Sequence, residues 1–423
     1  MAKVLISFLG TGRIKKVKKG NSSREYEPTN YRIGKKDYEC TFVSIALRKH
    51  LKIKKLILIG TTHSMWEEVY RVYTQREDNI WFEIGDTCDK NNYKSELTIP
   101  HKEKIEAAMG KGSQAILVKY GITAEEIQQN SEIILGLENS LKEGDELYVD
   151  ITHSFRSLPL YIMNLLVYLR DVSSKKIKIS GIYYGMLEAT SDLGYTPIVD
   201  LSDVLNVSSW ISGAYSFMEF GNADKIAELV RSIDSNLCAD LLQFSNTKNL
   251  NHLAELERQS QKLSKLLQQS QLPSMARMLI VPIIGDFVQR LSVDEKSPYR
   301  HSKFQSKLAR WQFNNKNYLA AYISLQEAII TYHAEAYQVE SGVDIDVYDK
   351  NKRDAIKDKL NDRNDMSISK EWKKLSRNVS LKRNALAHNT KKEYGPKKIN
   401  VTQSFIDSLK SFLGSYERLA NNQ

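Results

Sequence analysis

Apolar and polar positions follow two different patterns along this chain. Before about residue 205, short runs of β-branched residues alternate with segments in which apolar residues recur every three to four positions. After that point only the helical period remains. Strands that alternate with helices favour a parallel, doubly wound sheet. The pattern therefore predicts a Rossmann-like α/β domain over residues 1–202 and an all-helical domain over residues 203–423.

The individual elements follow from the same pattern. Predicted strands lie at residues 4–9, 55–60, 80–84, 115–119, 146–151 and 177–184. Predicted helices lie at residues 37–51, 101–109, 124–141 and 158–172, and then at 223–233, 254–268, 276–291 and 318–335. Residues 339–365 are polar and poor in apolar side chains, which predicts a loop or insertion. Glycine usage supports the division, because 14 of the 20 glycines lie before residue 205.

Composition excludes several classes of protein. With 423 residues, 41% of them hydrophobic and 26% charged, the chain has the balance of a soluble globular protein with two or three domains. We find no apolar run of about 18 residues and no signal-peptide pattern, so we expect a cytoplasmic protein. Cys40, Cys88 and Cys238 form no CxxC pair, and the histidines form no HExxH motif. The sequence therefore predicts neither structural zinc nor another metal site.

The positive charge is concentrated near the C-terminus. Of a formal net charge of +10, residues 351–400 contribute 15 basic against 6 acidic side chains, a local charge of +9. Clustered positive charge is typical of a protein that binds a polyanion such as a nucleic acid. The alternative is a solvated lysine-rich face without a partner.

Arg383, Asn384 and His388 lie within this basic segment. Asn384 and His388 are four positions apart and share a helix face, whereas Arg383 lies about 100° around the helix. Arginine holds phosphates and histidine transfers protons near neutral pH, so this trio indicates chemistry on an RNA backbone. One helix carries only part of such a site, which a second copy of the helix could complete. The alternative is an amphipathic surface helix on which His388 caps a carbonyl.

The end of the first predicted strand carries Gly10-Thr11-Gly12-Arg13. Glycines let backbone amides approach a ligand closely, and Thr11 and Arg13 add hydrogen-bond donors. Position 15 is lysine, so this is not the dinucleotide-binding fingerprint, and it is not a Walker loop either. A tight structural turn is the alternative interpretation.

Two further strand ends are polar. The strand ending near residue 151 leads into Thr152, His153, Ser154, Arg156 and Ser157, directly before a predicted helix whose first turn contains a proline. Free amides at such a helix start favour anions. His63 and Ser64 follow another strand and form a weaker third element. Three polar strand ends at one sheet edge predict a wide pocket for a large polar ligand such as a nucleotide or oligonucleotide.

These motifs carry a resemblance to known families. The N-terminal segments concerned are Val4-Leu5-Ile6-Ser7-Phe8-Leu9-Gly10-Thr11-Gly12, Gly60-Thr61-Thr62-His63-Ser64-Met65-Trp66 and Asp150-Ile151-Thr152-His153-Ser154-Phe155-Arg156-Ser157-Leu158-Pro159. They resemble CARF domains, the CRISPR-associated Rossmann-fold sensors. The helical half resembles HEPN ribonuclease domains, in which a polar residue follows the arginine of an arginine–histidine pair, here Arg383, Asn384 and His388. The combination covers nearly the whole chain and is similar to ancillary ribonucleases of type III CRISPR systems.

The resemblance implies a homodimer, or an assembly of dimers, whose CARF domains bind cyclic oligoadenylate. Of the two rings, tetra-adenylate is favoured over hexa-adenylate. Binding is expected to activate paired HEPN domains, which cut single-stranded RNA without a metal and leave 2′,3′-cyclic phosphate ends. A ring of repeating adenylates also matches the two-fold axis of a dimer. The ligand residues implied by the matching motifs are Gly10, Thr11, Gly12, Arg13, His63, Ser64, Thr152, His153, Ser154 and Arg156.

Within the HEPN motif each residue receives a role. His388 is the expected general acid/base or the group that positions the 2′-hydroxyl. Arg383 is the expected electrostatic clamp on the phosphorane. Asn384 is expected to orient His388 or a phosphate oxygen. Lysines expected to hold the RNA backbone non-specifically are Lys382, Lys391 and Lys392.

Several alternatives stay open at this point. Some members of the family also degrade their activator in the CARF pocket, and Thr11 and Ser154 would be the participants here. A cyclic oligoadenylate sensor whose helical half only docks a partner would keep the binding without the cleavage. A nucleotide-using Rossmann enzyme would need the dinucleotide or Walker signature, and a helical DNA-binding regulator would need a helix-turn-helix signal; neither stands out.

Overall fold

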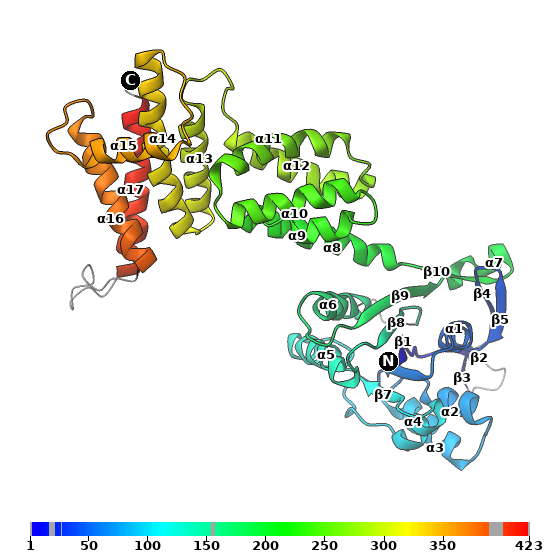
Figure 1. The fold of residues 1–423 in the computed structure, drawn as a ribbon. Helices are drawn as coiled ribbons and strands as arrows, with labels where there is room; N and C mark the ends of the chain where they lie inside the picture. Colours follow the sequence, from blue (N-terminus) through cyan, green and yellow to red (C-terminus); the bar gives the residue numbers. More distant parts are fainter. Residues whose placement is uncertain (1, 17–21, 27, 154–156, 389–400, 422–423) are drawn as a thin grey trace. The chain divides into compact units, whose positions relative to one another are not determined.

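The structure is a computed structural model that describes residues 2–16, 22–26, 28–153, 157–388 and 401–421. The chain divides into two compact units, Met1–Ser208 and Ser209–Gln423 (Figure 1). The first unit is an α/β structure and the second is helical, which confirms the predicted fold class. No helix in the described ranges is long and apolar enough to cross a lipid bilayer.

An eight-stranded sheet forms the centre of the first unit, in the order β5-β4-β10-β9-β8-β1-β6-β7 (Figure 1). These strands are β1 (Lys3–Phe8), β4 (Thr29–Ile33), β5 (Lys36–Cys40), β6 (Lys55–Gly60), β7 (Gln114–Leu117), β8 (Glu146–Asp150), β9 (Lys178–Gly185) and β10 (Thr196–Asp200). The strands from β9 to β7 run parallel, whereas β10 is antiparallel to β9 and β4 is antiparallel to β5. A separate antiparallel pair joins β2 (Arg13–Lys16) to β3 (Ser22–Glu25).

Helices cover both faces of the sheet. They are α1 (Val43–Leu51), α2 (Trp66–Thr74), α3 (Asn79–Lys90), α4 (Lys102–Met109), α5 (Ala124–Gly136) and α6 (Leu158–Asp171). Successive residues of a strand face opposite ways, so Val4 and Ile6 join a core with α5 and α6, whereas Leu5 and Leu56 join a core with α1, α2 and α4. The central strands are therefore apolar on both faces, as a covered parallel sheet requires.

Two predicted elements of this unit are wrong. Residues 80–84 lie inside helix α3 rather than in a strand, because Asp78 accepts hydrogen bonds from the amides of Ile80 and Trp81 and caps the helix start. The helix predicted from residue 37 begins at Val43, because residues 36–40 form β5. A two-residue turn with Gly34 at φ +59° folds β5 back on β4. The other five predicted strands are confirmed, with ends that differ by two residues at most.

The second unit consists of helices. They are α8 (Ser202–Phe220), which begins in the first unit, followed by α9 (Asp224–Val230), α10 (Ser235–Asn249), α11 (Leu253–Gln269), α12 (Ser274–Leu291), α13 (Arg300–Asn314), α14 (Tyr318–Ser341), α15 (Lys350–Asn361), α16 (Lys370–His388) and α17 (Val401–Asn421). The four helices predicted in this half are confirmed. The prediction of a loop at 339–365 is wrong in part, because α15 lies within it.

The described part of the helical unit contains two large hydrophobic cores and one small cluster around Ala334, Ile345 and Val347. One is formed by α8 to α12 together with the first half of α13, and includes Phe217, Phe244 and Phe287. The other is formed by the end of α13 with α14 to α17, and includes Tyr332 and Trp372, whose rings stack at 4.7 Å. Because α13 packs in both cores, it joins the first helical bundle to the second.

Candidate functional site

The three polar strand ends lie side by side at one edge of the sheet. β1 stands between β6 and β8, so residues 10–12, 61–64 and 151–153 all follow the carboxyl ends of neighbouring parallel strands. The chain also reverses its direction of winding at β1, with β6 added on one side and β8 on the other. Open α/β sheets bind ligands in the crevice at such a switch point. The fold therefore brings together the loops on which the CARF-like motifs lie.

Asp150 organises the loop after β8. Its carboxylate is fully buried and accepts hydrogen bonds from Ser7 Oγ at 2.6 Å, from the amide of Thr152 at 3.0 Å and from Thr152 Oγ1 at 2.5 Å. Thr152 Oγ1 in turn accepts from the amide of Gly185 at 2.7 Å. A buried carboxylate is stable only with several such donors. Asp150 therefore fixes the backbone of Thr152 to β1 and β9.

Gly10 and His153 both contact the side chain of Tyr26. The amide of Gly10 donates to the Tyr26 hydroxyl at 2.9 Å, and a Cβ on Gly10 would lie 2.7 Å from that oxygen, so a larger residue would displace the hydroxyl. The ring of Tyr26 stands edge-on to the ring of His153 at 5.2 Å. His153 Nε2 is buried and has no hydrogen-bond partner among the described residues. Burial lowers the pKa of His153, against a smaller opposing effect of Asp150, so its ring is neutral at pH 7.

The loop after β6 is tied to the first strand. Ser64 is fully buried; its Oγ donates to the carbonyl oxygen of Leu9 at 2.8 Å and accepts from the amide of Thr61 at 2.9 Å. His63 Nδ1 lies 2.8 Å from the carbonyl oxygen of Cys88. These contacts favour a role for Ser64 in holding β1 and β6 in register, and its role in ligand binding stays a prediction.

The remaining predicted ligand residues are described only in part. Thr11 and Gly12 are half-buried at the end of β1, and Gly12 has φ +72°, a conformation that favours glycine. Arg13 begins β2, and its side chain lies outside the described part of the structure. Ser154 and Arg156 also lie outside the described residues.

Sequence reasoning gave no role to Asp150 or Ser7 in this site. An acidic residue at the end of a buried strand and a serine inside an apolar strand are signals that they pair, because neither side chain is buried without a partner. Tyr26 and Gly10 are 16 residues apart in the sequence, so no local sequence pattern predicts their contact.

The second group of candidate residues lies on the last two turns of α16. Arg383 donates to Asn384 Oδ1 from Nε at 3.1 Å and from Nη2 at 2.7 Å. Arg383 is half-buried, whereas Asn384 and His388 are exposed, and the intervening Ala385 is buried in the second helical core. The helix thus presents all three polar side chains at its surface. The structure pairs Asn384 with Arg383, and the predicted orientation of His388 by Asn384 stays a prediction.

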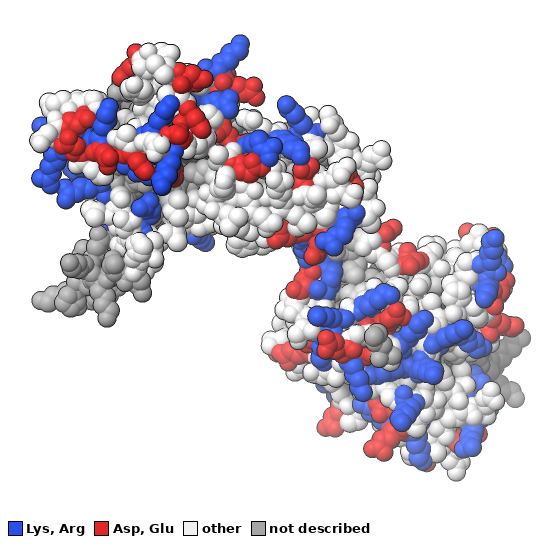
Figure 2. Space-filling model, in the orientation of Figure 1, with Lys and Arg blue, Asp and Glu red and all other residues white. Residues whose placement is uncertain are grey.

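The surroundings of this helix end are basic. α16 contains six basic residues and one acidic residue, a formal charge of +5. Figure 2 shows Lys and Arg side chains gathered over the α15–α16 end of the helical unit, interspersed with acidic ones. Lys382 Nζ lies over the ring of Phe405 at 4.6 Å, while Lys391 and Lys392 lie outside the described residues.

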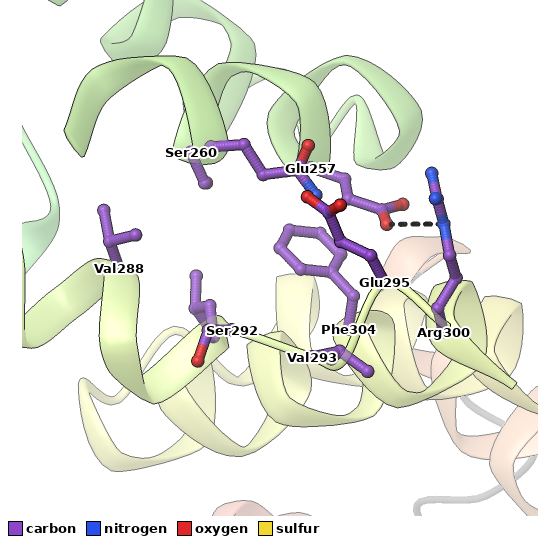
Figure 3. A pocket seen from close by; sticks show the side chains of 10 residues that line it. Glu257, Ser260, Val288, Ser292, Val293, Glu295, Arg300 and Phe304 are labelled. Atoms are coloured by element: carbon purple, nitrogen blue, oxygen red, sulfur yellow. Dashed lines mark ion pairs between the residues drawn. The ribbon is translucent and has the colours of Figure 1, made fainter. Parts of the chain in front are cut away.

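A separate cavity of about 150 Å³ lies between α11, the end of α12 and the start of α13 (Figure 3). Glu257 at its wall is buried, with His301 Nδ1 at 2.7 Å, Arg300 Nε at 3.7 Å and the Tyr348 hydroxyl at 3.4 Å. Arg300 and His301 lie at the start of α13, and Tyr348 lies just before α15. The polar contacts of Glu257 therefore connect α11 to these two segments. Within the described ranges, no three His, Cys, Asp or Glu side chains are grouped so that they could hold a metal ion.

Comparison with known protein families supports the prediction of a CARF domain in the first unit. Residues 4–188 match the family described as CRISPR system endoribonuclease Csx1, CARF domain, and residues 206–297 match the second domain of CRISPR-associated protein MJ1674. Residues 4–188 therefore match a CARF domain, as the motifs predicted. The HEPN nuclease predicted within residues 203–423 stays a prediction.

One curated protein and one solved structure align with most of this chain. CRISPR-associated protein MJ1674 of Methanocaldococcus jannaschii is 33% identical over 359 residues, which cover 81% of this chain and 55% of that protein. The chain thus spans about half the length of this relative. A solved structure, Enterococcus italicus Csm6 bound to cyclic hexa-2′-fluoro-hexa-dAMP, aligns with 99% of this chain and 93% of that chain at a TM-score of 0.40 and 9% identity.

Proposed function

We propose that the protein is a cyclic oligoadenylate-activated endoribonuclease that cuts single-stranded RNA in type III CRISPR antiviral defence. The observation that carries this proposal is that a CARF domain occurs together with half-buried Arg383, which is held by exposed Asn384, four residues before exposed His388. A chain whose helical half only docked a partner would not need an arginine and a histidine together at an exposed helix end.

The chemistry proposed for α16 uses its own side chains and needs no metal. His388 accepts the proton of an RNA 2′-hydroxyl, or positions that hydroxyl, as its oxygen attacks the adjacent phosphorus. Arg383, with its guanidinium held by Asn384, stabilises the additional negative charge on the phosphorane oxygens. The bond to the 5′-oxygen then breaks, that oxygen takes up a proton, and the products carry a 2′,3′-cyclic phosphate and a 5′-hydroxyl.

The proposed activator site is the crevice at the ends of β1, β6 and β8. The backbone near Gly12 and the predicted donors after β8 suit the phosphates and riboses of a cyclic oligoadenylate, with the tetra-adenylate ring favoured. In a homodimer two such crevices can face one ring across a two-fold axis. The same symmetry brings together two copies of the α16 end, each of which supplies one arginine and one histidine.

The test is cleavage of a fluorescent single-stranded RNA in EDTA, with cyclic tri-, tetra- and hexa-adenylate added one at a time. We expect cleavage with one ring only, and a loss of at least about a hundredfold in Arg383→Ala and in His388→Ala. Wild-type protein that binds a ring tightly yet leaves RNA intact would instead establish the alternative, a sensor that docks a partner.

A further inference from the structure

A groove of about 470 Å³ runs between α16 and α17, on the helix that carries Arg383 and His388. We call it the α16–α17 groove and define it by six of the residues that line it: Lys374, Asn378, Ser411, Phe412, Ser415 and Arg418. The two helices run antiparallel, because Lys382 near the end of α16 contacts Phe405 near the start of α17, while Lys374 lines the groove with Arg418.

The two cations of the groove form no ion pair among the described residues. Lys374 and Arg418 are exposed, and neither forms an ion pair with any residue that the structure describes; Arg418 Nη2 only donates to Ser415 Oγ at 3.3 Å. By contrast, Arg310 pairs with Glu417, the neighbour of Arg418, at 2.7 Å. Two cations without carboxylate partners at the sides of a groove are suited to an anionic ligand.

The base of the groove is apolar and aromatic. Phe412 is half-buried at the groove, and Leu375 beside it is 5% exposed. Asn378 and Ser411 add uncharged donors next to this surface. Proteins that bind single-stranded nucleic acid without sequence preference combine a basic groove for the backbone with aromatic faces on which bases stack.

The groove leads along α16 toward the proposed catalytic end. Asn378 is five residues before Arg383, about 7.5 Å along the helix axis, and ten residues before His388, about 15 Å along it. Lys382 lies one turn beyond Asn378 on the same face. Arg383 lies about 140° around the helix from Asn378, so a strand held in the groove passes Lys382 and turns around α16 to reach Arg383.

We propose that the α16–α17 groove is an RNA subsite that holds the single-stranded segment next to the scissile phosphate. Lys374 and Arg418 bind backbone phosphates, and Phe412 stacks with a base. Glu371 also lines the groove, but it stands in the first turn of α16, where a carboxylate stabilises the helix start and is farthest from Arg383. This inference rests on the proposed ribonuclease function and assigns part of its substrate path.

The experiment measures binding of a labelled single-stranded RNA to the full chain carrying His388→Ala, which prevents turnover. Lys374→Glu with Arg418→Glu is expected to weaken binding about tenfold or more at low salt, and to reduce the slope of log affinity against log salt by about 1.4, or 0.7 for each lost phosphate contact. Phe412→Leu is expected to weaken binding about tenfold while the salt slope stays unchanged, because stacking releases no counterion.

The matched control is Lys265→Glu with Lys296→Glu, the same change of charge on exposed lysines outside both the groove and the basic segment 351–400. If the groove pair lowers affinity and salt slope no more than this control, the subsite is refuted, even where the unmutated chain cleaves RNA. A chain that neither binds nor cuts RNA refutes the proposed function itself. If the groove variants change the sedimentation of the protein instead of its RNA affinity, the groove is an interface between copies.

Discussion

The contact between Arg383 and Asn384 gives the proposed catalytic arginine a fixed direction. Two guanidinium nitrogens share one amide oxygen, at 3.1 and 2.7 Å. Asn384→Ala removes that acceptor and frees an exposed side chain to adopt other rotamers. We expect kcat for RNA cleavage to fall about tenfold with KM nearly unchanged, because orientation acts mainly in the transition state. Steady-state kinetics at a saturating ring concentration measure this effect.

The control at the same scale is Gln403→Ala. Gln403 also holds an exposed partner on its own helix, since its Nε2 donates to Asp407 at 2.9 Å, but it lies outside the proposed site. Its kcat should equal that of the wild type. If Asn384→Ala retained full kcat, the fork would be a surface contact without a catalytic role.

For individual residues, the sequence predicted the position on a helix or strand better than the hydrogen-bond partner. A helix places Asn384 and His388 on one face by period alone, and α16 does extend to His388. Which side chain Asn384 contacts depends on rotamers, and the structure selects the adjacent Arg383. Likewise, the polar residues after β8 could be recognised from sequence, whereas their attachment to Ser7 through Asp150 required strand pairing across 143 residues.

The packing of α14 on α16 has a pH dependence that originates at His333. Its ring stands edge-on to Trp372 at 5.0 Å, its Nε2 is buried without a partner among the described residues, and burial lowers its pKa from 6.5 to about 4. Between these two values the unfolded chain binds a proton that the folded chain excludes. The free energy of unfolding therefore falls as pH falls through this window, by about 2 kcal/mol at pH 5 for this group.

Urea unfolding of wild type and His333→Leu at pH 7.5 and pH 5 measures this contribution. The wild type should lose about 2 kcal/mol more than the variant between the two conditions, since leucine has no proton to gain. Equal losses in the two proteins would mean that His333 titrates alike in the folded and unfolded chains, contrary to its packing against Trp372.

Helices were predicted wrongly where a polar residue, rather than a periodic pattern of apolar residues, determines the local structure. The apolar residues at 80–84 resemble a strand, yet Asp78 caps a helix there. Helix α15 has few apolar residues and is held in place by buried Arg353. This side chain donates to Thr331 Oγ1 at 3.0 Å and to the carbonyl oxygen of Val347 at 2.7 Å. A hydrophobic pattern contains no information about such contacts, so a helix without an apolar stripe was predicted to be a loop.

Over the whole molecule, the alternation of strands and helices sufficed to predict the parallel centre of the sheet, since β–α–β connections are local in sequence. It did not predict β4, β5 and β10, which extend the sheet beyond β9 through pairings between distant segments. The division of the helical half into two cores was also missed, because helices that pack in different cores have the same period.

The continuity of α8 gives the molecule a path from the proposed ring site to the helical unit. α8 runs from Ser202 to Phe220 across the boundary between the units at residues 208 and 209. Arg170, near the end of α6, donates from Nη1 to the carbonyl oxygen of Leu205 at 3.0 Å and to Ser208 Oγ at 2.8 Å. Because α6 begins directly after the loop that follows β8, we expect a ring bound at the proposed site to act on α8 through Arg170.

Arg170→Gln should separate ring binding from activation. Ring affinity, measured by calorimetry, is expected to stay near the wild-type value, whereas the ring-induced increase in RNA cleavage is expected to shrink about tenfold, within the usual range of coupling between two sites. The control, Arg258→Gln, removes an exposed arginine that pairs with Glu255 on its own helix, and should preserve both quantities. If Arg170→Gln were activated as fully as wild type, α8 would carry the signal without this clamp. A parallel loss of ring affinity and thermal stability would instead identify Arg170 as a residue that only stabilises the first unit.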